Sequence, residues 1–299
     1  MDITYHEPTY AVFGDAGGHY QPLAQGLKEL GVTLGTDGQG YSIPRNLTII
    51  QAGDLIHKGP DSEQIVALVG MLMMKNNSDD SKGTWIQLIG NHESHYIPGA
   101  RPFWPYPMEN KNSIERIHGW WKDGSARLHF VIPQNEGKNF VVSHAGVSRK
   151  LFNRGVREQK RNHSNELDAF SAYIESLQPA NMRTASKAGA MLYGKISDDA
   201  GLFWAESVSE VYATWRDEDA PFHQIHGHVT PYAWMQEGFY SNVPLIFRKE
   251  LLLDPVNRRS IWINNETMYI GIDPGFDVEC DREAIVPLML TQNGLMPGR

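Results

Sequence analysis

The strongest constraint on the fold is a short apolar run that ends in a polar loop carrying a carboxylate. Residues 47–50 read Leu-Thr-Ile-Ile, and the loop over residues 52–61 contains Asp54 and a Gly-Pro turn. Such a run predicts a buried strand of a parallel sheet, because strands covered on both faces are apolar throughout. Ligands of open α/β sheets bind beyond the carboxyl ends of the strands, so Asp54 is expected in a binding site.

The same unit occurs on either side of this strand. Residues 10–13 are apolar and lead into Asp15, and residues 85–89 are apolar and lead into Asn91 and His92. Three predicted strands therefore end in Asp, Asp and Asn-His. This pattern predicts one metal site that is assembled from three loop tips.

Two strands predicted later in the chain, residues 139–143 and 223–229, add histidines to this set. The candidate ligands are Asp15, Asp54, Asn91, His144 and His228. A single Asp at a strand end is often only a helix cap, and a single buried His is often only a packed side chain. Five such residues at five strand ends are not explained in this way. Oxygen and imidazole ligands without thiolate suit Mn²⁺, Fe or Zn²⁺, and a carboxylate shared by two ions is typical of dinuclear phosphoesterases.

Composition narrows the class of protein. Hydrophobic residues make up 41% and charged residues 21% of the 299 residues, as in ordinary globular domains. The net charge of −8 argues against non-specific binding to nucleic acid. The single cysteine, Cys280, excludes an internal disulfide and a multi-cysteine zinc site. The N-terminus has no secretory signal pattern, and no apolar run approaches the roughly 20 residues that span a membrane. We therefore expect a cytoplasmic protein without membrane partners; its oligomeric state is left open.

We predict a single domain over residues 1–299, interrupted by two insertions. Residues 96–107 are rich in proline and aromatic side chains, and form either a wall of the site or a packed surface loop. Residues from about 149 to 220 are charged and helical in character, so a helical insertion is expected there. Short apolar runs in the last third are predicted to be strands, at residues 245–247, 261–263 and 268–273.

The ordered motifs resemble the signature blocks of the calcineurin-like metallophosphoesterases. The resemblance is closest to the branch of serine/threonine protein phosphatases and bis-nucleosyl tetraphosphatases, and it covers about residues 9–290. The blocks are Gly14-Asp15, Gly53-Asp54 with Gly59-Pro60-Asp61, Gly90-Asn91-His92-Glu93, Ser143-His144-Ala145-Gly146, Gly227-His228 and Ile272-Asp273-Pro274-Gly275. The resemblance implies an α/β fold, a four-layer α/β/β/α sandwich, around a centre of two divalent metal ions.

The resemblance also implies a role for each matching residue. Asp54 would bridge the two ions, and Asp15 would bind the first of them. The second ion would be bound by Asn91, His144 and His228. His92 would act as the general acid that protonates the leaving oxygen.

Three positions of the sequence depart from the family pattern. Gly17 stands where the family has a histidine ligand, and His57 and Lys58 replace an Asp-Arg pair. In the family that aspartate orients the acid histidine and that arginine binds the phosphate. Lys58 can still supply positive charge, but not a bidentate fork. His19 and His57 are the imidazoles that could replace the missing ligand, so the first ion is expected to bind weakly unless one of them does.

We therefore predict an enzyme, a metal-dependent phosphoesterase that hydrolyses small phosphoesters through attack by a metal-activated water. The substrates expected are phosphodiesters or phosphomonoesters, including nucleotides, with Mn²⁺ favoured over Fe or Zn²⁺. Lys58, Asn91 and Arg101 are the candidate substrate-binding residues. Two alternatives remain: a serine/threonine-type protein phosphatase, and a degenerate phosphoester-binding protein without catalysis.

Overall fold

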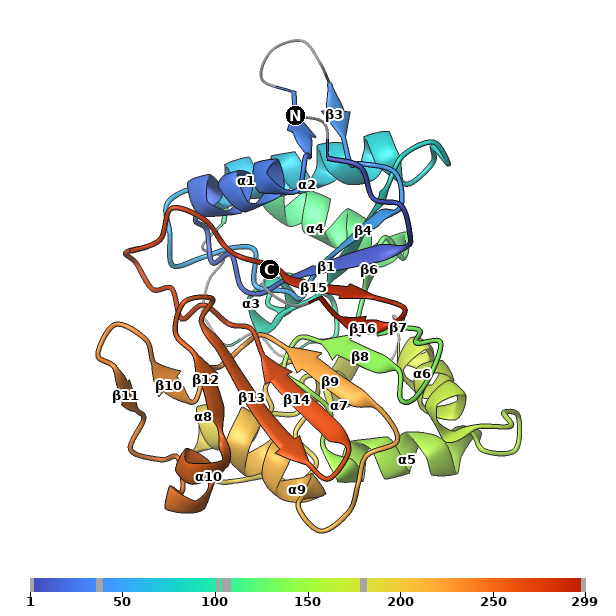
Figure 1. Ribbon diagram of the computed structural model, residues 1–299, viewed down its shortest axis with the longest axis vertical. Helices are drawn as coiled ribbons and strands as arrows, with labels where there is room; N and C mark the ends of the chain where they lie inside the picture. The colour runs from blue at the N-terminus through green and yellow to red at the C-terminus, as the bar shows by residue number, and fades with distance from the viewer. Residues whose placement is uncertain (1–2, 36–39, 101–102, 104–108, 178–181, 297–299) are drawn as a thin grey trace.

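Two mixed β-sheets stack face to face, and helices cover the outer face of each (Figure 1). A computed structural model describes residues 3–35, 40–100, 103, 109–177 and 182–296. The first sheet has the order β16-β15-β1-β4-β5-β6, and the second has the order β12-β13-β14-β9-β8-β7. The resulting four layers are the α/β/β/α sandwich that was predicted.

The strands of the first sheet are β1 (Thr9–Phe13), β4 (Leu47–Gln51), β5 (Thr84–Leu88), β6 (Ala126–Arg127), β15 (Leu288–Thr291) and β16 (Gly294–Leu295). The strands of the second sheet are β7 (His129–Ile132), β8 (Phe140–Ser143), β9 (His223–His226), β12 (Leu252–Asp254), β13 (Arg259–Asn264) and β14 (Thr267–Gly271). Two small hairpins are formed by β2 (Thr33–Leu34) with β3 (Tyr41–Ser42) and by β10 (Tyr232–Ala233) with β11 (Gly238–Phe239).

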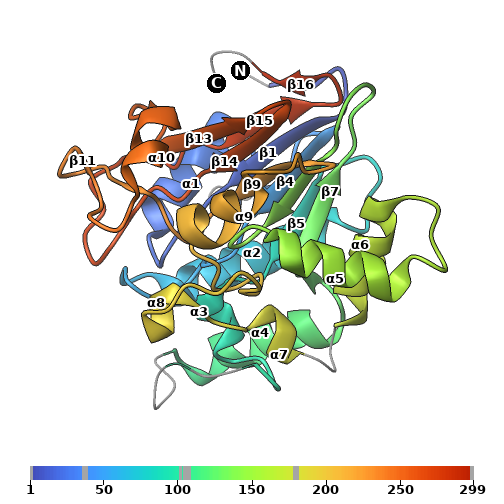
Figure 2. The same ribbon diagram turned by 90° about the horizontal axis from the view of Figure 1, so that it is seen from below.

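Helices α1 (Tyr20–Glu29), α2 (Ser62–Asn76) and α4 (Lys111–Lys122) lie on the outer side of the first sheet (Figure 1). Helices α5 (Arg149–Gln159), α6 (Glu166–Ser176) and α9 (Ala213–Trp215) lie over the second sheet when it is viewed from below (Figure 2). The remaining helices are α3 (Asn91–Ser94), α7 (Met182–Ala185), α8 (Ala190–Tyr193), the π-helix η1 (Ser207–Tyr212) and α10 (Leu245–Glu250). In the described part of residues 149–220, every regular element is a helix.

Alternation along the strands builds a separate core on each face of a sheet. In β1, Tyr10 and Val12 point into the core between the sheets, whereas Ala11 and Phe13 pack under the helices. Opposite them, Phe140 and Val142 of β8 enter the same inter-sheet core. These strands are apolar on both faces because both faces are covered. The two sheets are therefore locked together, and the loops at their strand ends are held in fixed positions.

The direction of the strands decides where the loops meet. β1, β4, β5 and β6 run parallel in the first sheet, and β8, β9 and β14 run parallel in the second. The carboxyl ends of parallel strands lie at one edge of a sheet, where ligands of α/β proteins bind. Every predicted ligand follows one of these strands.

Two details differ from the sequence-based expectations. Residues 245–247 begin a helix, α10, in which Phe247 is buried while Leu245 and Ile246 are exposed. A three-residue apolar run has no period, so the strand prediction could not exclude a short helix. The sequence of residues 127–133 predicts one strand, but the structure divides it: β6 pairs with β5 in the first sheet, and β7 pairs with β8 in the second. No helix among the described residues is long and apolar enough to cross a membrane.

Candidate metal centre

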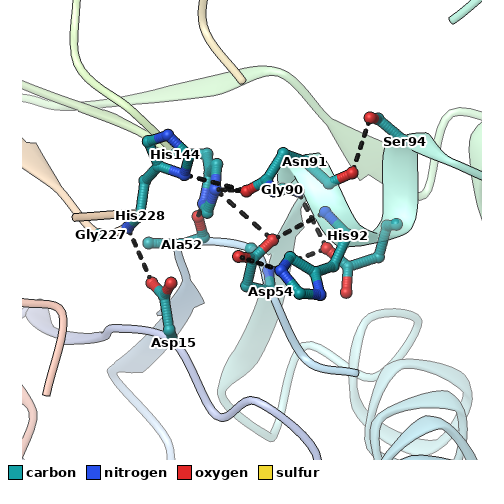
Figure 3. A network of polar contacts seen from close by, with 12 residues as sticks. Asp15, Ala52, Asp54, Gly90, Asn91, His92, Ser94, His144, Gly227 and His228 are labelled. Atoms are coloured by element: carbon teal, nitrogen blue, oxygen red, sulfur yellow. Dashed lines mark hydrogen bonds and ion pairs between the residues drawn. The ribbon is translucent and has the colours of Figure 1, made fainter. Parts of the chain in front are cut away.

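The polar residues predicted at strand ends converge at one edge of the sandwich (Figure 3). Asp15, Asp54 and Asn91 follow β1, β4 and β5 of the first sheet, and His144 and His228 follow β8 and β9 of the second. All five are at least 90% buried. The structure therefore brings together the whole ligand set that the sequence predicts.

We call Asp54, Asn91, His144 and His228 the second half-site. Asn91 Oδ1 lies 2.8 Å from His144 Nε2 and 2.9 Å from His228 Nδ1. His144 Nδ1 donates to the backbone carbonyl of Ala52 at 2.9 Å, so the facing Nε2 is a lone-pair acceptor. This Nε2 is also 3.4 Å from Asp54 Oδ1. The Asn91 oxygen, His144 Nε2 and Asp54 Oδ1 thus face one another across a short gap, an arrangement that favours a positive group between them.

The side-chain amide of Asn91 does not carry enough hydrogen-bond donors for all of these acceptor atoms. Turned by half a rotation, its nitrogen would donate to His144 Nε2, His228 Nδ1 and both oxygens of Asp54. An amide nitrogen carries two hydrogens, so it cannot satisfy four acceptors at once. A cation in the same place is attracted by every one of them. Asp54, His144 and His228 offer ligand atoms that all lie within 4.8 Å of one another, a donor set that fits a divalent ion.

We call Asp15, Asp54, Gly17, Lys58 and Asp273 the first half-site. Asp15 Oδ1 accepts a hydrogen bond of 3.0 Å from the backbone N–H of His228. Its Oδ2 is buried and has no hydrogen-bond partner among the described residues. Burial and then the charge of Asp273 raise the pKa of Asp15 well above its usual range. A buried carboxylate oxygen without a donor is costly and favours a nearby cation.

Lys58 supplies positive charge at the first half-site. A Cβ built on Gly17 would lie 3.5 Å from Lys58 Cδ, so the lysine stem occupies the direction in which a side chain at position 17 would point. Desolvation lowers the pKa of Lys58, but the carboxylates of Asp273, Asp15 and Asp54 outweigh it and raise the pKa overall. Lys58 is exposed to solvent, so it stands at the open side of this carboxylate cluster.

The loops of the first half-site are joined by backbone hydrogen bonds. Gly17 N donates to Asp54 O at 2.8 Å, and Gly59 N donates to Gly17 O at 2.7 Å. Gly17 has a φ of +53°, in the left-handed region that glycine tolerates best. Asp54 and Lys58 adopt positive φ as well, at 55° and 61°. Such strained backbone in non-glycine residues is concentrated at functional sites, because it aims side chains that a relaxed loop would not.

Glu93 fixes the spacing between the loops of Asp54 and Asn91. Its Oε2 accepts hydrogen bonds from the backbone N–H groups of Asp54 and Gly90, at 2.8 and 2.9 Å. Its Oε1 accepts from Leu55 N at 2.8 Å. A Cβ on Gly90 would lie 2.1 Å from Asp54 Oδ1, so glycine is needed for this close approach. Within the Gly-Asn-His-Glu block, Gly90 and Glu93 therefore fix the positions of Asn91 and His92, which lie between them.

Burial dominates the electrostatics of the centre. It raises the pKa of Asp54 to about 7 and that of Glu93 to about 7. It lowers the pKa of His144 to about 4 and holds that of His228 well below its usual range. The imidazoles are thus neutral, the state in which they bind metal, while Asp54 must lose a proton to do so near neutral pH.

The sequence profile of the calcineurin-like phosphoesterase family matches residues 8–253. The chain belongs to this family. It is accordingly a metallophosphoesterase, a hydrolase whose family uses a dinuclear centre of divalent ions, and the group formed by Asp54, His144 and His228 could hold such an ion. No curated protein sequence matches the chain significantly.

Two solved structures with TM-scores above 0.5 show the same fold. The cold-active protein-tyrosine phosphatase of a psychrophilic Shewanella species superposes with a TM-score of 0.52 at 15% identity, over 99% of this chain and 79% of that one. A point mutant of a cold-active protein tyrosine phosphatase gives a TM-score of 0.53 at 16% identity, over 98% and 78% of the two chains. A Saccharomyces cerevisiae protein serine/threonine phosphatase with similarity to human PP5 gives 0.47 at 13% identity, over 96% and 70%.

The other residues predicted for this phosphoesterase site fall in different places. His92, on α3, has its Nε2 3.7 Å from Asp54 Oδ2. His57 Nδ1 lies 2.9 Å from His92 Nδ1, so His57 is a partner of the predicted acid. His19 Nε2 contacts the carbonyl oxygen of Asp277 at 2.7 Å. Arg101 lies outside the described residues.

Three features of the site were missed by sequence reasoning. Asp273 follows the parallel strand β14, and it was noted only as part of a motif although the same strand-end rule applies to it. Phe103 packs edge-on against His92 and Trp204, with ring centroids 5.7 and 5.0 Å apart. Trp204 in turn stands edge-on to His228 at 5.8 Å. The two aromatic rings belong to the two predicted insertions, and no local pattern could show that they would meet.

Proposed function

We propose that this phosphoesterase hydrolyses small phosphodiesters and phosphomonoesters, with a complete site for one divalent ion and an incomplete site for a second. The observation that carries the proposal is the set of acceptor atoms of the second half-site, which face one another within 2.8 to 3.4 Å. Such an arrangement is favourable with a divalent ion in place and repulsive without one. Mixed oxygen and imidazole ligands favour Mn²⁺, with Fe and Zn²⁺ as the other candidates.

The residues divide the work as follows. Asp54, Asn91, His144 and His228 would hold the second ion, and Asp15 with Asp54 would hold the first. When bound, the ions lower the pKa of a water and neutralise the phosphoryl oxygens. His92 donates a proton from Nε2 to the leaving oxygen. Lys58 and Asn91 attract and orient the phosphate.

Two aromatic side chains beside the metal centre, Phe103 and Trp204, favour a small substrate. Phe103 packs against His92 and Trp204 packs against His228, so both rings lie beside the metal centre. Lys58 in place of an arginine supplies one charge without a bidentate fork, which favours phosphoesters with fewer anionic oxygens. These two features favour a phosphodiesterase over a protein phosphatase, for which a long peptide would have to cross the site.

The test is metal reconstitution followed by turnover. The purified protein is stripped with chelator, then assayed on bis-p-nitrophenyl phosphate and p-nitrophenyl phosphate with Mn²⁺, Fe²⁺ or Zn²⁺ added back. We expect hydrolysis that depends on metal and is faster on the diester. A phosphopeptide that is hydrolysed far faster than either compound would favour the protein phosphatase. Metal binding without hydrolysis of any of the three would favour the degenerate binding protein.

A further inference from the structure

His92 is held by a chain of side chains that leads away from the metal centre. His57 Nδ1 lies 2.9 Å from His92 Nδ1, and His57 Nε2 lies 2.7 Å from Tyr96 Oη. Tyr96 Oη accepts a hydrogen bond of 3.2 Å from the backbone N–H of Glu109. His57 and His92 are 4% and 9% exposed, so these contacts are largely shielded from water. None of the three partners belongs to either half-site, and the reaction as described above leaves their purpose open.

The hydrogen bonds have a direction. A contact of 2.9 Å between two ring nitrogens requires that one of them carries a proton and the other does not. Tyr96 Oη accepts from Glu109 N and can give its own hydrogen to His57 Nε2, which lies 2.7 Å away. A His57 that accepts at Nε2 carries its proton on Nδ1 and donates it to His92 Nδ1. His92 then carries its own proton on Nε2, the nitrogen that faces Asp54.

We propose that Tyr96 and His57 are positioning residues that hold His92 in the tautomer with its proton on Nε2. This inference rests on the proposed function, because a general acid needs that proton on the nitrogen that faces the leaving oxygen. The hydrogen bond made by one ring nitrogen of a histidine sets the protonation of the other. His57 thereby orients His92 by donating to it, whereas a carboxylate at position 57 would orient it by accepting.

The backbone around His57 supports a dedicated role. Its φ of +70° lies in the left-handed region, which is uncommon for residues other than glycine. Its N–H donates to Ser62 Oγ at 2.9 Å, at the start of α2, and this bond fixes the strained loop. His57 Nε2 also lies 3.6 Å from Glu109 Oε1, beyond hydrogen-bond distance, so the contact with Tyr96 at 2.7 Å is the hydrogen bond at this nitrogen. Strain that aims one ring at another is expected where the ring has a task.

The decisive pair of variants is His57→Asn and His57→Asp. The two side chains have nearly the same shape and both tolerate positive φ, so they share any cost in folding. The Asn amide can donate to His92 Nδ1, whereas the Asp carboxylate can only accept from it. Tyr96→Phe removes the hydroxyl that orients His57 and leaves its ring in place.

The readout is the protonation of the two ring nitrogens of His92. Long-range ¹H–¹⁵N spectra of protein labelled in histidine, both metal-free and loaded with diamagnetic Zn²⁺, report it, with His92→Ala providing the assignment. We expect an unprotonated Nδ1 in the native protein and in His57→Asn, a protonated Nδ1 in His57→Asp, and a mixture in Tyr96→Phe. A protonated Nδ1 in the native protein would overturn the proposal, as would spectra of His92 that are the same in His57→Asn and His57→Asp.

Kinetics link the tautomer to catalysis. Tyr96→Phe should lower kcat for an alkyl phosphodiester by about tenfold and leave KM unchanged. This loss is smaller than the ~10²–10⁴-fold that general acid catalysis supplies, because only the positioning of the acid is impaired. The same variant should change kcat for the bis-nitrophenyl ester less than about twofold, because nitrophenolate leaves without protonation. Equal losses on both substrates would refute the positioning role. A protein that hydrolyses neither ester refutes the proposed function, while the spectra still decide the direction of the hydrogen bonds.

Discussion

The two half-sites of this centre share Asp54 and lie at the same edge of the sandwich, yet they balance charge in opposite ways. The second half-site combines one carboxylate with the neutral groups of Asn91, His144 and His228. The first gathers the carboxylates of Asp15 and Asp273 around Lys58, whose pKa they raise. Gly17, where the family has an imidazole, lies under the lysine stem. The comparison indicates that a fixed ammonium group can offset part of the negative charge that a second ion would otherwise neutralise.

This difference has a consequence for metal binding. An ion at the second half-site meets four protein ligands, so it should bind tightly. An ion at the first half-site meets two carboxylates, with Asp273 close by, and it is repelled by the ammonium of Lys58. The predictions below test this asymmetry, from the residue that both half-sites share to the residue that distinguishes them.

The largest effect is expected from Asp54→Asn. Both half-sites lose their shared carboxylate, so bound metal should fall close to zero and turnover should fall by on the order of 10²–10³-fold. Asp80→Asn, at an exposed position in a turn, is the control for a general effect of lost charge. Metal content is measured by plasma mass spectrometry after gel filtration, and the fold is checked by circular dichroism. Full activity in Asp54→Asn would show that the metal centre takes no part in the reaction.

The next effect separates the two half-sites directly. His144→Ala should lose the tightly bound ion, because an imidazole of the complete set is gone. Asp15→Asn should keep that ion and lose only the occupancy that appears at high metal concentration. Titration calorimetry on the two variants measures both affinities. Equal loss of the tight ion in the two variants would show that the half-sites do not differ.

The sequence predicted the second half-site better than the first, for a physical reason. Each ligand of the second half-site follows a parallel strand directly, so strand-end position alone placed Asn91 and His144. Lys58 acts through a side chain that crosses to Gly17, and this contact depends on how two loops are zipped together. No periodicity in the sequence encodes such a pairing between loops.

Local sequence patterns carry no information on contacts between distant segments, and this also explains which other predictions were wrong or incomplete. His57 stands where the family has the orienting aspartate, and its contact with the His92 ring at 2.9 Å depends on a tyrosine that lies 39 residues further along. Most of the strands followed from the apolar runs, whereas the four-layer sandwich was what the resemblance to the family implied. The strand predicted at residues 245–247 was too short for its period to be measured.

Acidity should weaken the tight ion by about one power of ten per pH unit. The pKa of Asp54 is raised to about 7, so below that pH the metal-free protein holds a proton that the ion must displace. His144, with a pKa lowered to about 4, adds no second proton until the pH is far lower. Affinity should therefore rise with pH up to about 7 and then level off. Calorimetry about one pH unit below that value, in buffers of different ionisation enthalpy, should show about one proton released; no release would mean that Asp54 is already ionised.

The smallest effect is expected from restoring the missing imidazole with Gly17→His. The substitution places a side chain at φ +53°, which costs roughly 1–2 kcal/mol, and its Cβ would touch Lys58 Cδ. Gly17→Ala carries the same backbone cost without a ligand, so the two variants are compared with each other. We expect up to about tenfold tighter binding of a second ion in Gly17→His than in Gly17→Ala, because one more protein ligand replaces water. Native protein that already holds two tight ions would break the comparison and point to His19 or His57 as the substitute. His19→Ala and His57→Ala would then show which of them releases the second ion.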